Sequence, residues 1–102
     1  MTYNFDALIV GGGASGLMCA IIAKRQNPKL NIAIIEKNDR VGKKLLSTGN
    51  GRCNITNKNL SKENYHGDNE FAMKFISKFG FDQTVEFFKK LGVIIKVEEN
   101  GK

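Results

Sequence analysis

The sequence predicts an α/β fold that begins with a parallel βαβ unit, and three observations support this prediction. An apolar run, Ala7–Val10, stands directly before the glycine-rich run Gly11–Gly16. A second apolar run, Ile32–Ile35, follows a stretch with helical spacing and ends at the acidic residue Glu36. Strand, glycine-rich turn, helix, strand and acid in this order are typical of a Rossmann-like dinucleotide-binding unit.

The glycines fit the pattern G-x-G-x-x-G, in which each position has a physical role. Gly11 allows the tight turn from strand to helix, Gly13 lets a pyrophosphate approach bare backbone, and Gly16 lets the helix pack closely on the sheet. Glu36 follows 20 residues after Gly16, where a carboxylate can accept hydrogen bonds from ribose hydroxyls and repels the 2′-phosphate of NADP. The alternative for Glu36 is a surface carboxylate paired with Lys37.

The first turn of the predicted helix offers backbone N–H groups that have no acceptor within the helix. They belong to Gly13, Ala14, Ser15 and Gly16. Because the helix dipole favours negative charge at this end, the turn is a candidate site for a phosphate. The alternative is that Ser15 caps the helix and no ligand binds.

Local signals set the boundaries of this βαβ unit, which spans residues 1–37. Residues 3–10 are predicted to form the first strand, and its second half is apolar throughout, as in a parallel strand buried on both faces. The helix is predicted to start near Ala14 and to end before Pro28, because proline disfavours helical geometry in the preceding residue. Ile32–Ile35 is predicted to form the second strand.

Residues 38–60 are rich in glycine, serine, threonine and asparagine, which predicts a loop with a short helical turn over residues 43–47. Long ordered loops are often functional. Glycines here offer bare N–H groups, and lysine or arginine side chains can offset phosphate charge. The candidate ligand-binding residues are Lys37, which follows Glu36, and, in this loop, Gly42, Lys43, Lys44, Ser47, Thr48, Asn50, Gly51 and Arg52. The alternative is a basic loop that binds nothing.

Two short amphipathic helices and a strand are predicted within residues 68–102. Asp82 is the expected N-cap of the second helix, and Gly92 is expected just beyond its end. The apolar stripes are expected to be core, or an interface to a further part of the protein. They consist of Phe71, Phe75 and Phe79 in the first helix and Val85, Phe88 and Leu91 in the second.

The last predicted element is a strand over Val93–Val97, followed by the hairpin turn signal Asn100-Gly101. A hairpin requires a second strand, so we expect the chain to stop within an element and to be an incomplete fold.

Composition bounds the classes of function. A chain of 102 residues with 41% hydrophobic and 25% charged residues is ordinary for one globular domain. The net charge is +6, yet no basic run or recognition motif accompanies it, so nucleic acid is not an expected partner. No apolar run approaches the ~20 residues that span a bilayer, which predicts no membrane segment and a cytoplasmic location. The cysteines Cys19 and Cys53 lack the spacing of a metal site.

Two motifs together are distinctive: the run from Ala7 to Leu17 and the run from Gly42 to Asn57. The second contains Gly-Lys-Lys followed by Gly-Asn-Gly-Arg-Cys-Asn, and it is the more specific because many enzymes have a glycine-rich turn. With both motifs, the chain closely resembles the amino-terminal part of the BaiN-like flavoproteins, also called the aminoacetone oxidase family of FAD-binding enzymes. The resemblance covers essentially the whole chain.

The resemblance implies that the cofactor is FAD. The unit of residues 1–37 would then hold its ADP half, and the loop of residues 38–60 would run along the pyrophosphate toward the isoalloxazine. Full members of this family look much longer than this chain. They resemble oxidoreductases that use NAD(P)H or oxygen. A small-molecule substrate, NAD(P)H as electron donor and the remainder of its own full-length chain are therefore the expected partners.

Three hypotheses follow for function. The first is the FAD-binding segment of a flavin-dependent oxidoreductase, in which the flavin carries hydride transfer and residues 1–102 alone are inactive. The second is a non-catalytic fragment with no independent activity. The third is an NAD-dependent dehydrogenase, which the glycine pattern alone fits equally well but which does not require the loop at residues 42–57. No catalytic side chain is predicted.

Overall fold

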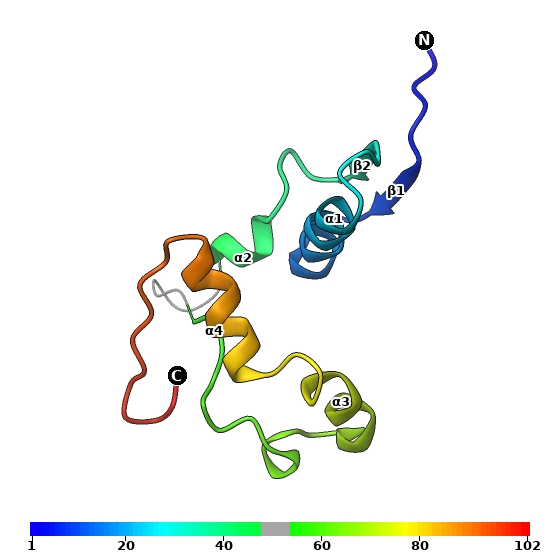
Figure 1. The fold of residues 1–102 in the computed structure, drawn as a ribbon. Coiled ribbons are helices and arrows are strands. Elements are labelled where there is room, and N and C mark those ends of the chain that lie inside the picture. Colours follow the sequence, from blue (N-terminus) through cyan, green and yellow to red (C-terminus); the bar gives the residue numbers. More distant parts are fainter. Residues whose placement is uncertain (48–53) are drawn as a thin grey trace. The chain divides into compact units, whose positions relative to one another are not determined.

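The computed structural model describes residues 1–47 and 54–102. The chain divides into two compact units, an amino-terminal unit, Met1–Arg52, and a carboxy-terminal unit, Cys53–Lys102 (Figure 1). The division falls within the loop predicted at residues 38–60. Each unit is described by itself.

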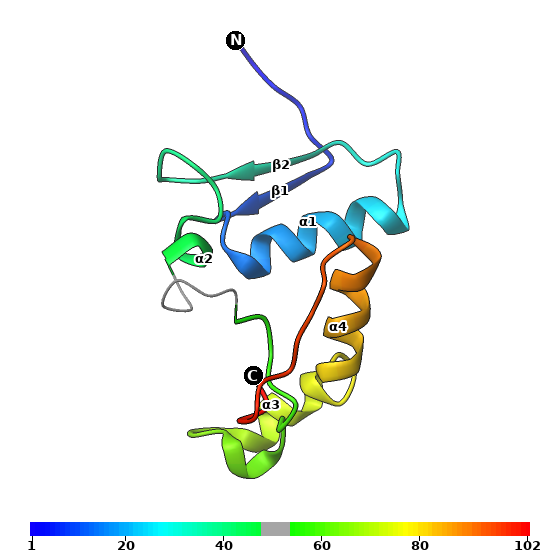
Figure 2. The same ribbon diagram turned by 90° about the vertical axis from the view of Figure 1, so that its left-hand side faces the viewer.

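The amino-terminal unit contains the predicted βαβ arrangement. Strand β1 (Ala7–Val10) pairs in parallel with strand β2 (Ile32–Ile35), in a register that sets Ala7 opposite Ile32 and Val10 opposite Ile35. Helix α1 (Ala14–Gln26) connects them and runs along one face of the pair (Figure 2). The short helix α2 (Lys43–Ser47) follows β2, as the sequence predicted.

The first strand is shorter than the predicted span of residues 3–10, because pairing starts only at Ala7. Asp6 marks the boundary: its backbone N–H donates to the Asn31 carbonyl at 2.8 Å, and its carboxylate accepts from the Asn31 N–H at 2.8 Å. The partner strand begins at Ile32. Residues 3–6 therefore have no strand beside them and stay outside the ladder.

Helix α1 starts and ends where the sequence predicted. Asn27 donates its backbone N–H to the Ala23 carbonyl at 3.0 Å and then takes an extended conformation. Pro28 follows directly, and its ring disfavours helical geometry at Asn27. The connection therefore turns back toward β2 at this point.

The prediction that the strands are buried on both faces is wrong for the described residues. Ile32 and Ile34 lie beside α1, since they line a groove with its side chains. On the opposite face, Leu8, Val10 and Ile35 are 54%, 83% and 50% exposed. Side chains alternate along a strand, and α1 covers only one of the two faces. The strands are therefore apolar on both faces, but only the face beside α1 is covered.

The carboxy-terminal unit is helical. It contains a 3₁₀ turn, η2 (Lys62–Asn64), helix α3 (Asn69–Ile76) and helix α4 (Phe81–Lys90). Phe87 is its buried apolar side chain, with an edge-to-face contact to Phe88 at a centroid distance of 5.2 Å. The stripe predicted for the first helix forms no core within this unit: Phe71 and Phe75 on α3, and Phe79 just after it, are all accessible. The alternative, an interface to a further part of the protein, stays a prediction.

Helix α4 is bounded by two glycines. Gly80, not the predicted Asp82, is its N-cap, and the Gly80 N–H donates to the Gln83 side chain at 2.9 Å. A Cβ at Gly80 would lie 2.8 Å from the Ile76 carbonyl oxygen, so the close approach of α3 places a glycine there. At the other end Gly92 has a φ of 84° and follows the C-cap, as predicted, and Val93 donates to the Phe88 carbonyl at 3.1 Å.

The predicted strand over Val93–Val97 is wrong, since residues 54–102 contain no strand. A strand requires a neighbouring backbone to complete its ladder, and these residues have none within the described part of the chain. The turn predicted at Asn100-Gly101 is present. The Gly101 N–H donates to the Glu98 carbonyl at 2.9 Å, and Gly101 has a φ of 85°. The Gly101 carbonyl in turn accepts from the Lys58 N–H at 2.7 Å.

Helix α3 offers a direct test of capping. The Asp68 carboxylate accepts from the Phe71 N–H at 2.9 Å, which satisfies one free donor of the first turn. Asp68→Ala is expected to lower the free energy of unfolding by about 1 kcal/mol. Asp82→Ala removes an acid from the first turn of α4 that is not its N-cap, and a loss of only about 0.3 kcal/mol is expected. Urea unfolding of both variants measures the difference, and equal losses would contradict this capping assignment.

Within the part of the chain that the structure describes, no helix combines the length and the apolar character that crossing a membrane requires.

Candidate dinucleotide-binding site

The glycine-rich turn joins the carboxyl end of β1 to the start of α1. Gly11 has a φ of 99°, a left-handed conformation that favours glycine, and its N–H donates to the Ile35 carbonyl at 2.7 Å. The chain therefore leaves β1 while still bonded to the end of β2. This sharp turn aims the start of α1 at the carboxyl edge of the two strands, where open α/β sheets bind ligands.

Gly16 sets the contact between helix and turn. It is buried, and a Cβ at this position would lie only 2.0 Å from the Gly11 carbonyl oxygen. It would also lie 3.4 Å from the Ile9 side chain. The close approach of α1 to the strand therefore depends on the missing side chain, which is the packing role that the spacing predicted.

Gly13 has the opposite surroundings. It is the N-cap of α1, it is exposed, and a Cβ built there would meet no atom within 4 Å. No side chain caps the helix, which rules out the alternative role of Ser15 as the cap. The first turn also contains no acidic residue. The N–H groups of Gly13, Ala14 and Ser15 thus begin a helix that has no side-chain cap and has open space beside the Gly13 α-carbon, which fits a bound phosphate.

Glu36 lies directly after β2, and its side chain reaches the glycine-rich turn at Gly12. Its Oε2 accepts from the Gly12 N–H at 2.8 Å, and its Oε1 accepts from the backbone N–H of Asn38 at 2.9 Å and the side-chain amide of Asn38 at 3.0 Å. Among the described residues, Glu36 is thus bonded to Gly12 and Asn38, and the alternative of an ion pair with Lys37 is wrong. The carboxylate bridges the ends of both strands.

These hydrogen bonds keep Glu36 ionised. The backbone N–H of Asn38 and then that of Gly12 lower the pKa of the Glu36 carboxyl group, while partial desolvation acts in the opposite direction. An ionised carboxylate only accepts hydrogen bonds, which is the state that suits ribose hydroxyls as donors.

The lowered pKa predicts a pH dependence of stability. A carboxyl group with a depressed folded-state pKa stabilises the fold above its unfolded value, about 4.3 for glutamate, and this contribution is lost as the pH falls through the folded-state pKa. Thermal melts between pH 3 and pH 7 are therefore expected to show an acid loss of stability that Glu36→Gln reduces. Glu99→Gln is the matched control and should leave it unchanged. An identical acid loss in Glu36→Gln and the parent protein would contradict this role.

The second predicted cluster is described only in part. The Gly42 N–H donates to the Gly12 carbonyl at 2.7 Å, which brings the start of the cluster onto the glycine-rich turn. Lys43 forms an exposed ion pair with Asp39 at 3.6 Å, and the Ser47 hydroxyl donates to the Lys44 carbonyl at 2.9 Å. The other predicted residues of the cluster lie outside the described residues; they are Thr48, Asn50, Gly51 and Arg52.

Three residues at the site were not predicted from sequence: Gly12, Asn38 and Val41. Gly12 is buried and would bring a Cβ within 2.6 Å of the Val41 side chain. The sequence did carry a signal for Gly12, since the dinucleotide pattern requires only Gly11 and Gly13 of the Gly-Gly-Gly run and does not account for the middle glycine. The contact of Val41 with Gly12 joins positions that are distant in the chain, so the sequence carries no comparable signal for it. Asn38 bonds to Glu36, only two residues away, but the sequence analysis did not single it out.

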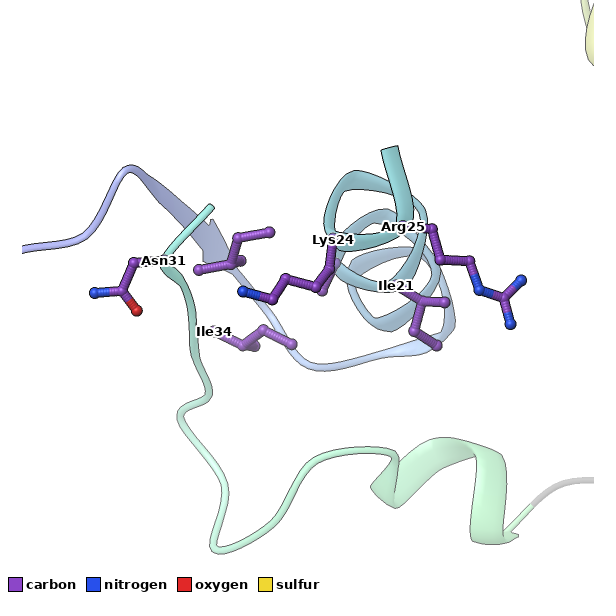
Figure 3. Close-up of a pocket in the computed structure, with 7 residues that line it drawn as sticks. Ile21, Lys24, Arg25, Asn31 and Ile34 are labelled. Carbon is purple, nitrogen blue, oxygen red and sulfur yellow. The ribbon is translucent and has the colours of Figure 1, made fainter. Parts of the chain in front are cut away.

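A separate groove lies between α1 and β2, with a volume of about 550 Å³ (Figure 3). Lys24 extends from α1 toward the β2 side, where its ammonium donates to the Leu30 carbonyl. The lining residues are mostly apolar: Ala20, Ile21, Lys24, Arg25, Asn31, Ile32 and Ile34. The groove follows the helix instead of the glycine-rich turn, so it is not part of the candidate site.

The fold and the glycine-rich turn together define a Rossmann βαβ unit, the class of structure that holds dinucleotides at the carboxyl ends of its strands. The chain belongs to the HI0933-like protein Rossmann domain family, which matches residues 5–102. This membership agrees with the family resemblance of the two sequence motifs.

Curated relatives agree with the family. The chain is 47% identical over 89 residues to the 3-dehydro-bile acid delta(4,6)-reductase of Clostridium scindens, covering 86% of this chain and 22% of that protein. It is 30% identical over 91 residues to the ribosomal RNA dihydrouridine synthase of Escherichia coli, covering 88% of this chain and 22% of that one. A shorter match, 50% over 36 residues, covers 35% of this chain and 6% of the fumarate reductase flavoprotein subunit of Proteus vulgaris.

The chain thus spans about a fifth of the length of the first two of these relatives. No solved structure matches it.

Proposed function

We propose that residues 1–102 are the FAD-binding segment of a flavin-dependent oxidoreductase. The observation that carries the proposal is the pairing of an open helix start at Gly13 with an ionised carboxylate at Glu36, both at the carboxyl edge of β1 and β2. The helix start suits a pyrophosphate and the Glu36 carboxylate suits a ribose, and both groups belong to the ADP half of a dinucleotide.

The residues fit the ADP half of FAD in a specific way. Backbone N–H groups at the start of α1 would bind phosphate oxygens, and Glu36 would accept from ribose hydroxyls. Gly13 leaves room for the phosphates because a Cβ there would meet nothing within 4 Å. Lys44, which is exposed on α2, would supply positive charge near the pyrophosphate, with Arg52 as a second cation.

The relatives support flavin over nicotinamide at this site. One relative is a flavoprotein subunit by name, and two are reductases by name. A flavin supplies hydride transfer once it is bound. In this proposal the remainder of a full-length chain completes the site, a small molecule is the substrate, NAD(P)H is the electron donor and the protein acts in the cytoplasm.

Cofactor choice tests the proposal in the full-length protein. FAD is expected to stay bound through gel filtration, and Lys44→Ala combined with Arg52→Ala should weaken FAD binding by about a hundredfold, because two charge-assisted contacts worth about tenfold each are lost. Lys89→Ala, on an exposed lysine of α4, is the control and should have no effect. Tight NAD binding that survives the double substitution, with no FAD retained, would establish an NAD-dependent dehydrogenase instead.

A further inference from the structure

The segment after β2 folds back over the glycine-rich turn and holds the Gly12 residue on three sides. The Gly12 N–H donates to Glu36 at 2.8 Å, and the Gly12 carbonyl accepts from the Gly42 N–H at 2.7 Å. Val41 covers the α-carbon, since a Cβ on Gly12 would lie 2.6 Å from a Val41 methyl group. The segment of residues 38–42 is therefore a wall of the candidate site as well as a connection.

Within this wall, Asn38 contacts Glu36 twice. Its backbone N–H and its side-chain amide both donate to Oε1, at 2.9 Å and 3.0 Å. Oε2 accepts from the Gly12 N–H, and the backbone N–H of Lys37 makes a further, smaller contribution to lowering the pKa of this carboxylate. Each carboxylate oxygen has about two acceptor positions, so Oε1 is filled and Oε2 keeps one position for a further donor.

We propose that Asn38 is a positioning residue for dinucleotide recognition. Its side-chain amide holds the Glu36 carboxylate in the orientation that bridges to Gly12 and leaves Oε2 to accept from a ribose hydroxyl. The inference rests on the proposed function, because it assigns the free position on Oε2 to the ribose of the ADP half.

The backbone N–H of residue 38 is kept in Asn38→Ala and Asn38→Asp, so Asn38→Ala removes only the side-chain hydrogen bond to Oε1. The freed carboxylate can then rotate, and its bond to the ribose becomes weaker. Asn38→Asp keeps the shape but replaces the donor with a second carboxylate beside Oε1, which repels Glu36. Both variants are expected to act through Glu36 and not through the phosphates.

The test compares ADP with 2′-deoxy-ADP on the full-length protein freed of its cofactor, using calorimetric titration. The parent protein is expected to bind ADP about tenfold more tightly, as for the loss of one hydrogen bond to a charged group. Asn38→Ala should reduce this ratio to about threefold, and Asn38→Asp and Glu36→Ala should nearly abolish it. Phosphate recognition is shared by both probes, so a merely structural loss leaves the ratio unchanged.

Asn31→Ala is the matched control, because it also removes a hydrogen bond that an asparagine side-chain amide donates within the amino-terminal unit. The Asn31 amide donates to the Asn4 carbonyl at 3.1 Å. It should keep the parent ratio. A parent ratio in Asn38→Ala, together with a lost ratio in Glu36→Ala, would overturn the role of Asn38 and leave the proposed function standing. No ADP binding by the parent protein would overturn both.

Discussion

Gly16→Ala is expected to abolish the native packing of the amino-terminal unit and with it the binding of FAD. The new methyl group would lie 2.0 Å from the Gly11 carbonyl oxygen, and a backbone atom within a tight turn cannot move aside as a flexible side chain can. Helix α1 would have to separate from the turn. Overpacking of this kind costs about 3 kcal/mol or more, which is a large share of the stability of a domain.

Gly13→Ala is the matched control for this prediction. It makes the same chemical change three residues earlier, at a position with a φ of −83° and open space around the new methyl group. Thermal melts followed by circular dichroism should show a large loss for Gly16→Ala and almost none for Gly13→Ala. A parent-like melt of Gly16→Ala would show that helix and turn are not in the close contact described above.

Gly13→Val is expected to keep the fold and to reduce FAD affinity by about a hundredfold or more, which corresponds to about 2.7 kcal/mol. Its extended backbone accepts a branched residue without strain, and the structure holds no atom for the side chain to meet. The side chain instead fills the space where a pyrophosphate would approach the start of α1.

Two measurements separate fold from binding in Gly13→Val. The melting temperature should match that of the parent protein, and fluorescence titration should show the loss of FAD affinity. Lys78→Ala, on an exposed lysine of the carboxy-terminal unit, is the control for binding and should leave FAD affinity unchanged. Unchanged FAD affinity in Gly13→Val would mean that the cofactor does not approach this turn.

The sequence was sufficient where the determinants are local. Helix α1 starts after the glycine-rich turn and ends before Pro28, and strand β2 spans the predicted residues. The roles of Gly11 and Gly16 also follow from spacing, because a fixed turn between a strand and a helix allows few solutions. Conformational constraints of proline and glycine act on their immediate neighbours and are therefore readable.

The errors arose where distant residues decide the outcome. Val93–Val97 has the composition of a strand, but a strand requires a partner that the described residues do not supply. Helix α4 already begins at Phe81, so Gly80 is its N-cap and Asp82 lies within its first turn. The Ile76 carbonyl leaves no room for a side chain at the N-cap position. At the site, the bond from the Gly12 N–H to Glu36 could not be predicted, because it depends on how β1 and β2 pair.

The visible absorption spectrum of the full-length protein, recorded after incubation with FAD and gel filtration, tests the central claim most directly. The proposal predicts that flavin bands elute with the protein, and that they are absent for Gly13→Val under the same conditions. A folded, colourless protein that retains no flavin after this treatment would contradict the assignment of this chain as an FAD-binding segment.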